Sequence, residues 1–217
     1  MSVDYVKAAT KALETILKNN VSTAPVSVSA ILDQMAPAVL VTTFSDLAIR
    51  CGRERNDILK DFNCSSDAFT SAKYVNGRMC YTVTYNRDVH ISMLRISLAR
   101  ELGHIVLDHD GSRPEPVRME EARCFARHLL CPRPLLVAAK EAGIQLTTSA
   151  ICDMIGCSER FIGELKKTPP IHVPAHLNRE AKSQFATYVQ TLVDRIPHTD
   201  ADASPADLGA YLEEYED

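Results

Sequence analysis

The chain has 217 residues, of which 46% are hydrophobic and 24% charged, and these proportions exclude a disordered, collagen-like or coiled-coil chain. A chain of this length buries roughly 70% of its unfolded surface, so it can fold without disulfides or metals. The N-terminus lacks the basic and apolar regions of a signal peptide, and no apolar stretch approaches the ~20 residues that span a bilayer. We therefore expect a cytoplasmic protein with no membrane partner.

Cysteine and charge patterns add three expectations. The seven cysteines include no C-x-x-C pair, which favours buried reduced thiols over a disulfide framework or a zinc ribbon. Up to Arg195, 24 Lys and Arg residues stand against 21 Asp and Glu residues, so the body is only mildly basic and DNA binding is not indicated. We expect the acidic tail beyond Arg195 to be a solvated end. Its acidic residues are Asp200, Asp202, Asp207, Glu213, Glu214, Glu216 and Asp217.

The first half of the chain predicts helices around a small sheet. Apolar residues at 3- and 4-residue spacing predict an amphipathic helix over 4–19. Short helices over 27–35 and 43–51 flank a strand at 39–41. The Asn76-Gly77 dipeptide predicts a hairpin turn between strands at 68–70 and 79–85, because Asn-Gly favours the tight turn that hairpins need. We expect a small antiparallel sheet here.

The second half is predicted to be helical. Ile91, Leu94, Leu98, Leu102 and Ile105 form one apolar stripe on a helix of about four turns. The sequence Arg113-Pro114-Glu115-Pro116 predicts a loop, and a second helix then runs to the stop at residues 131–134. A small helical unit over 135–167 and a C-terminal helix complete an α+β fold. The buried face of the C-terminal helix is marked by Leu177, Ala181, Phe185, Tyr188, Leu192 and Ile196.

Two predicted helices contain a residue pattern that indicates a function. A zincin helix uses H-E-x-x-H because residues i and i+4 share one face, where two imidazoles can hold one ion. Here the segment is ELGHIVLDH, and EARCFARHLLCP follows on the second helix. The paired segments resemble the ImmA/IrrE family of zinc metallopeptidases, with its patterns hEhGHhhLxH and ExxA-N/D-xFAxxLLxP. The resemblance covers roughly residues 5–167.

This resemblance implies a fold and a division of the chain. It implies a zincin-like helical core with the small antiparallel sheet, a helix-turn-helix-like unit and a C-terminal helix. The expected parts are a peptidase core over 1–134, the helix-turn-helix-like unit over 135–170, and the C-terminal helix with the acidic tail over 171–217.

Carried over position by position, the family's active site is degenerate in this chain. The first histidine ligand falls on Arg100, the general-base glutamate on Glu101 and the second histidine ligand on His104. In ungapped register, the third-ligand glutamate falls on Met119 and the following Asn or Asp on Arg123. Two of the three implied metal ligands are therefore replaced.

An arginine has no lone pair to offer a metal, and its charge would repel zinc. We expect the Arg100 guanidinium to lie near the metal position and to pair with Glu101, Glu120 or Glu121. Met119 extends the apolar stripe of its helix, although a one-residue shift would bring Glu120 to the ligand place. A metal site would need another ligand in place of Arg100. Three histidines could be considered, but each is better interpreted as an ordinary surface or hydrogen-bonded residue. These histidines are His90, His109 and His128.

The stretch 148–167 matches a helix-turn-helix pattern, with Gly156 at the turn and Ser158 as the cap of the second helix. Only Arg160, Lys166 and Lys167 are basic there, so a packing or protein-binding role is favoured over DNA reading. A DNA-binding regulator through this stretch is the third and weakest hypothesis.

By resemblance, family members cleave helix-turn-helix repressors of phages or mobile elements. The leading hypothesis is a metal-free, catalytically silent relative, a pseudoenzyme that acts as a transcriptional regulator or antirepressor by binding a repressor-type protein. The alternative is a working zinc metallo-endopeptidase, with Glu101 as base and with His104 plus Glu120 or Glu121 on the metal. We expect no cofactor under the first hypothesis and zinc under the alternative.

Overall fold

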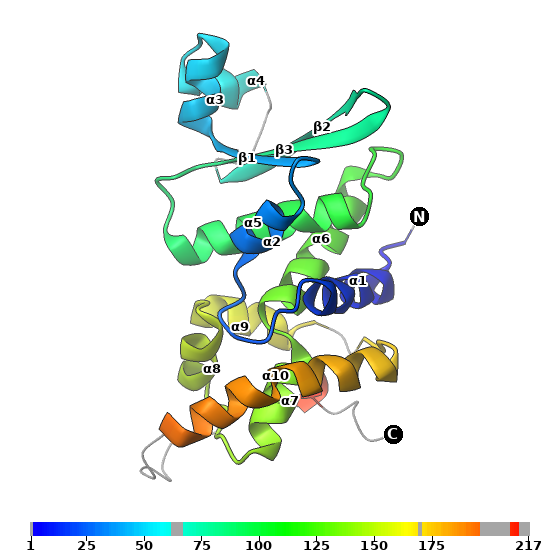
Figure 1. Cartoon of the computed structure of the whole chain (residues 1–217), viewed down its shortest axis with the longest axis vertical. Helices are drawn as coiled ribbons and strands as arrows, with labels where there is room; N and C mark the ends of the chain where they lie inside the picture. The colour runs from blue at the N-terminus through cyan, green and yellow to red at the C-terminus, as the bar shows by residue number, and fades with distance from the viewer. Residues whose placement is uncertain (1, 62–66, 169–170, 196–208, 213–217) are drawn as a thin grey trace. The chain divides into compact units, whose positions relative to one another are not determined.

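The computed structural model describes residues 2–61, 67–168, 171–195 and 209–212 as an α+β protein (Figure 1). It divides into two compact units. Unit 1 comprises residues 1–3 and 27–126, and unit 2 comprises residues 4–26 and 127–217. The helices and strands of unit 1 are α2 (Val28–Gln34), β1 (Val39–Thr43), α3 (Phe44–Cys51), α4 (Arg55–Asp61), β2 (Ala68–Val75), β3 (Arg78–Tyr85), α5 (Ile91–Val106) and most of α6 (Glu115–Leu130). Those of unit 2 are α1 (Tyr5–Lys18), α7 (Arg133–Glu141), α8 (Thr148–Ile155), α9 (Glu159–Lys166), α10 (Ala175–Arg195) and α11 (Gly209–Leu212).

The sheet of unit 1 has the order β1-β3-β2 and is mixed, which corrects the expectation of an antiparallel sheet. The predicted hairpin is confirmed: β2 and β3 are antiparallel and join through Asn76 and Gly77, which both have positive φ. Strand β1, however, is parallel to β3, with Val39 opposite Tyr81. The chain returns through α3 and α4 before it enters β2, and the hairpin reverses it again into β3, so β1 and β3 run the same way.

Helices cover both faces of this sheet (Figure 1). Helices α2 and α5 pack on one face, and α5 contacts both β2 and β3. On the other face, Phe44 and Ala48 of α3 and Ile58 of α4 form a buried cluster against Phe69 of β2. The alternation of side chains along β2 explains this division, because successive residues of a strand point to opposite faces.

Helix α5 approaches α6 closely at Gly103. A Cβ atom added there would lie 3.0 Å from Cδ1 of Phe125 and 3.3 Å from Cα of Ala122. The absence of a side chain at Gly103 therefore allows the Phe125 ring to pack on the backbone of α5. Leu98, Leu102 and Ile105 of the predicted stripe are buried, whereas Ile91 at the start of α5 is 63% exposed.

Two local predictions need correction. The loop predicted at 113–116 ends earlier, because α6 begins at Glu115 and takes Pro116 into its first turn. Proline is tolerated there since the first backbone N–H groups of a helix have no intrahelical partner. Helix α4 has no counterpart among the predicted elements.

Unit 2 is built around α10, which packs on α7 and α1. The amide of Gln184 donates to the carbonyls of Ile16 (3.2 Å) and Val21 (2.7 Å) and so ties α10 to the end of α1. The predicted turn is confirmed: Gly156 ends α8 with φ of 63°, and the Ser158 side chain caps α9.

The short helix α11 docks on α7 and α9 of unit 2. The Tyr211 hydroxyl donates a 2.8 Å hydrogen bond to the carbonyl of Cys131, and its ring lies 5.7 Å from that of His128. His128 is buried, and its Nε2 atom makes no hydrogen bond to the residues that the structure describes. The expected boundaries at residues 134 and 170 stay predictions, and all seven acidic residues of the tail lie outside the described residues.

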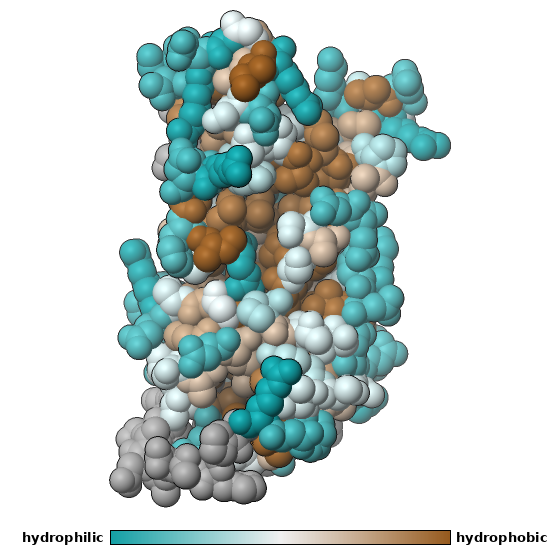
Figure 2. All heavy atoms as spheres, turned by 60° about the vertical axis from the view of Figure 1, so that its left-hand side comes forward, coloured by the Kyte–Doolittle hydropathy of each residue, from teal (hydrophilic) through white to brown (hydrophobic). Residues whose placement is uncertain are grey.

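The expectation of buried thiols holds for three positions, since Cys124, Cys131 and Cys157 are buried. Cys80 and Cys152 are half-buried and Cys51 is exposed, whereas Cys64 lies outside the described residues. On unit 1, apolar side chains gather at the level of the sheet and α5 (Figure 2). No described helix combines the length and apolarity that crossing a bilayer requires.

Candidate functional site

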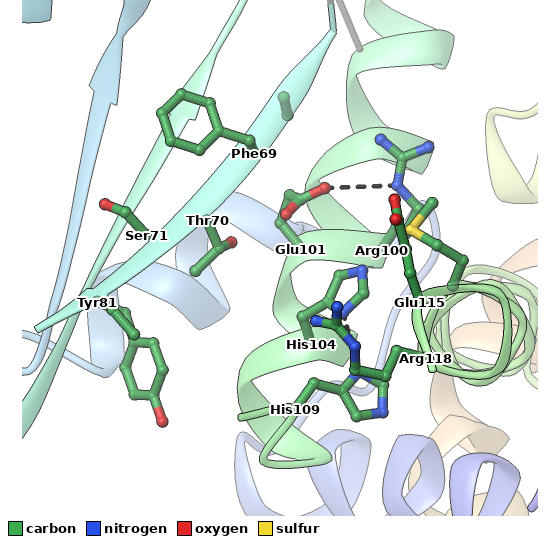
Figure 3. Close-up of a pocket in the computed structure, with 13 residues that line it drawn as sticks. Phe69, Thr70, Ser71, Tyr81, Arg100, Glu101, His104, His109, Glu115 and Arg118 are labelled. Atoms are coloured by element: carbon green, nitrogen blue, oxygen red, sulfur yellow. Dashed lines mark hydrogen bonds and ion pairs between the residues drawn. The ribbon is translucent and has the colours of Figure 1, made fainter. Parts of the chain in front are cut away.

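Unit 1 contains a pocket of about 500 Å³ between β2, α5 and the start of α6 (Figure 3). The residues at i, i+3 or i+4 on each helix share the face that borders it. Strand β2 contributes its first five residues, 68–72. The other lining residues are Tyr81, Arg100, Glu101, His104, His109, Glu115, Arg118 and Met119.

Arg100 and Glu101 form an ion pair beside this pocket (Figure 3). Their Nε and Oε1 atoms are 3.4 Å apart, and their side chains are only 16% and 7% exposed. Burial raises the pKa of the Glu101 carboxyl above its usual value, and the charge of Arg100 opposes this rise. Of the three carboxylates proposed as partners for Arg100, the structure thus pairs it with Glu101.

A chain of hydrogen bonds runs from His104 through His109 to Glu121. The Nδ1 atoms of His104 and His109 are 2.8 Å apart, and Nε2 of His109 lies 3.0 Å from the Glu121 carboxylate. Glu121 is buried and also accepts a 2.7 Å hydrogen bond from the Arg113 guanidinium. The carboxylate therefore holds a histidine on one side and an arginine on the other.

These partners determine where the histidine protons lie. Burial lowers the pKa of His109 and lowers that of His104 to about 4, so both rings are neutral at pH 7. The Glu121 carboxylate needs a donor, so His109 carries its proton on Nε2 and accepts at Nδ1. His104 then donates through Nδ1, and its Nε2 is left as a hydrogen-bond acceptor.

The other predicted site residues lie both inside and outside the pocket lining. Met119 lines the pocket with Arg100, Glu101 and His104. Glu120 and Arg123 are not pocket residues; they pair with each other at 3.4 Å. Glu121 is also outside the lining, because it faces His109.

The histidines considered as replacement ligands lie in three different places. His90 caps the N-terminus of α5 by accepting from the Ser92 amide. His128 belongs to unit 2. His109 does reach the pocket, because Asp108 adopts a left-handed conformation (φ 55°) just after α5 and the His109 amide donates to the His104 carbonyl. The sequence held a signal for this, since the segment ELGHIVLDH ends in His109.

The donors of this pocket do not fit the zinc ion that the family resemblance implies. A catalytic zinc is normally held by three protein ligands, and Arg100 and Met119 occupy two of the implied positions. The remaining one, His104, keeps a lone pair on Nε2, but a single imidazole falls short of three protein ligands. Within residues 2–61, 67–168, 171–195 and 209–212, no group of three or more His, Cys, Asp or Glu side chains is placed to hold a metal ion.

Comparison of the chain with protein-family models, with curated proteins and with solved structures finds no match. The chemistry of the site follows from its own residues. It offers guanidinium donors, an imidazole acceptor and a strand edge around one pocket. These groups are suited to binding a peptide segment.

Proposed function

We propose that this chain is a metal-independent protein of the ImmA/IrrE type that binds a segment of a repressor-type protein partner without cutting it. The observation that carries this proposal is the ion pair of Arg100 and Glu101 at the pocket. Arg100 stands where the resemblance implies a histidine ligand, and a guanidinium cannot coordinate zinc. The general-base position, Glu101, is engaged by a permanent cation instead of a metal-bound water.

The edge strand supports the binding part of the proposal. Strand β2 lies at the end of the order β1-β3-β2, so one of its edges has no neighbouring strand among the residues that the structure describes. Such an edge can accept an extended peptide through backbone hydrogen bonds, while neighbouring pockets receive alternate side chains. Because residues 68–72 line the pocket, a segment alongside β2 would place side chains in it. Holding a repressor in this way would keep it from its operator.

Random-peptide display on the full-length protein tests this proposal. Ala72 and its neighbour Lys73 are both exposed, but only Ala72 lines the pocket. The Ala72→Trp variant should bind selected peptides at least tenfold more weakly than the parent. The matched control, Lys73→Trp, should bind them as the parent does, because Lys73 is not among the residues that line the pocket.

The same peptides test for cleavage. Incubation with the protein and added zinc, followed by mass spectrometry, should return them intact. Cleavage that requires zinc and stops with a chelator would refute the proposal in favour of the zinc metallo-endopeptidase. Equal binding by the Ala72→Trp variant and the parent would show that the peptides bind elsewhere.

A further inference from the structure

Two arginines from different helices line the same pocket as His104. Arg100 is on α5 and Arg118 is on α6, and both line the pocket (Figure 3). Their charges add to the effect of burial in lowering the pKa of His104. The pocket thus holds two guanidinium groups and a neutral histidine.

Arg118 has donors available for a ligand. Its Nε atom donates to the carbonyl of Arg113 at 3.1 Å, which fixes the side chain across the pocket. Its terminal nitrogens make no hydrogen bond within the part of the chain that the structure describes. A guanidinium held by one nitrogen and open at the others is well placed to receive a carboxylate in bidentate geometry.

The negative charges of the pocket limit which anions the pocket can bind. Glu101 pairs with Arg100, and Glu115 is exposed at the pocket mouth. The two arginines are thus balanced by two carboxylates, while both histidines are neutral. A singly charged carboxylate fits this balance better than a doubly charged phosphate, which would meet stronger repulsion from the glutamates.

We propose that this pocket recognises a carboxylate of the bound segment through Arg118 and Arg100, with an adjacent N–H group of the segment donated to Nε2 of His104. The inference rests on the proposed function and names the chemistry that the segment must carry. A peptide supplies both groups where an amide N–H neighbours a C-terminal carboxylate or an acidic side chain.

Three small probes distinguish the sources of the carboxylate. N-acetyl-L-alanine carries a C-terminal carboxylate, N-acetyl-L-aspartic acid α-amide carries a side-chain carboxylate, and N-acetyl-L-alanine amide carries none. Each is titrated to 50 mM into the full-length protein, and the ¹⁵N shifts of His104 are followed by NMR. At least one carboxylate probe should bind fivefold or more tightly than the neutral amide, and the better of the two identifies the source.

Variants of two pocket residues test the assignment. Arg118→Gln should lower the affinity for the carboxylate to that for the neutral amide, and Arg118→Lys should retain part of it. Glu115→Gln should strengthen binding two- to threefold because it removes a repulsive charge. Arg160→Gln, an exposed arginine of α9, is the matched control and should leave the affinity unchanged.

Several outcomes would overturn the inference. These are equal binding of carboxylates and amide, unchanged affinity in Arg118→Gln, tighter binding of inorganic phosphate, or no binding of any probe at 50 mM. Display-selected peptides that bind at Ala72 but lack a carboxylate would overturn it too, while leaving the proposed function intact.

Discussion

Acidification from pH 7.5 to 5 should destabilise the folded protein, because the half-buried His104 and the buried His128 are neutral in it. Burial lowers the pKa of His104 in unit 1 and of His128 in unit 2 to about 4. In the unfolded chain, the same side chains bind a proton near pH 6.5. Between these values the unfolded state binds more protons, so the free energy of unfolding falls as the pH falls from 6.5 towards 4. Above pH 6.5, the contribution is fully present.

The expected size follows from the shift. Proton linkage between a pKa of 6.5 and one of about 4 gives a loss of about 2 kcal/mol per histidine at pH 5. In unit 1, Glu101 acts in the opposite direction, because its pKa is raised by burial. His128 is therefore the clearer probe.

Urea denaturation of the His128→Phe variant measures this effect. Phenylalanine keeps a ring against Tyr211 but has no group to protonate. Between pH 7.5 and 5, the variant should lose about 2 kcal/mol less unfolding free energy than the parent. The control is His176→Phe, which changes an exposed histidine and should lose as much as the parent. Equal losses in the parent and the His128→Phe variant would refute the reasoning.

Three further substitutions test the packing and the site. Gly103→Ala should lower the stability by about 1–3 kcal/mol, because the added Cβ would lie 3.0 Å from Phe125, and the better helix propensity of alanine should offset about 1 kcal/mol of this loss. Thermal unfolding measures the loss, and the control Gly163→Ala should show none, because a Cβ there meets nothing within 4 Å. Glu121→Gln should cost about 1–3 kcal/mol in urea denaturation, because it removes the buried negative charge that accepts hydrogen bonds from His109 and Arg113, whereas Glu120→Gln should change stability by under about 1 kcal/mol. Elemental analysis should find zinc in the Arg100→His, Met119→Glu double variant and none in the parent; a folded double variant without zinc would show that the register is wrong.

Much of the fold could be predicted because the local signals agree with the tertiary structure. The apolar stripes predicted α1 and α5, and Asn76-Gly77 predicted the position of the hairpin turn, although β2 extends to Val75, well beyond the predicted 68–70. The parallel pairing of β1 could not be predicted, since register between distant strands depends on tertiary contacts that leave no local pattern. The loop predicted around Pro116 is wrong for a different reason. The proline ring excludes this residue from a helix interior but suits the first turn of a helix.

For the candidate site, helical spacing brought Arg100, Glu101 and His104 together as expected, and the ungapped register placed Met119 beside them. The contribution of His109 depends on a single left-handed residue after α5, which sequence periodicity does not describe. Arg118 was missed because an arginine on an amphipathic helix usually indicates a solvated surface. Only the packing of α6 beside α5 and β2 turns it toward the pocket.

The strand order has a consequence for the folding kinetics. Strands β2 and β3 meet across a two-residue turn, whereas β1 pairs with β3 across an intervening stretch of chain that includes α3 and α4. Closing the longer loop costs more entropy, so the hairpin should form first and β1 should join it later. Substitutions in β1 should then mainly accelerate unfolding, while those in the hairpin should slow folding.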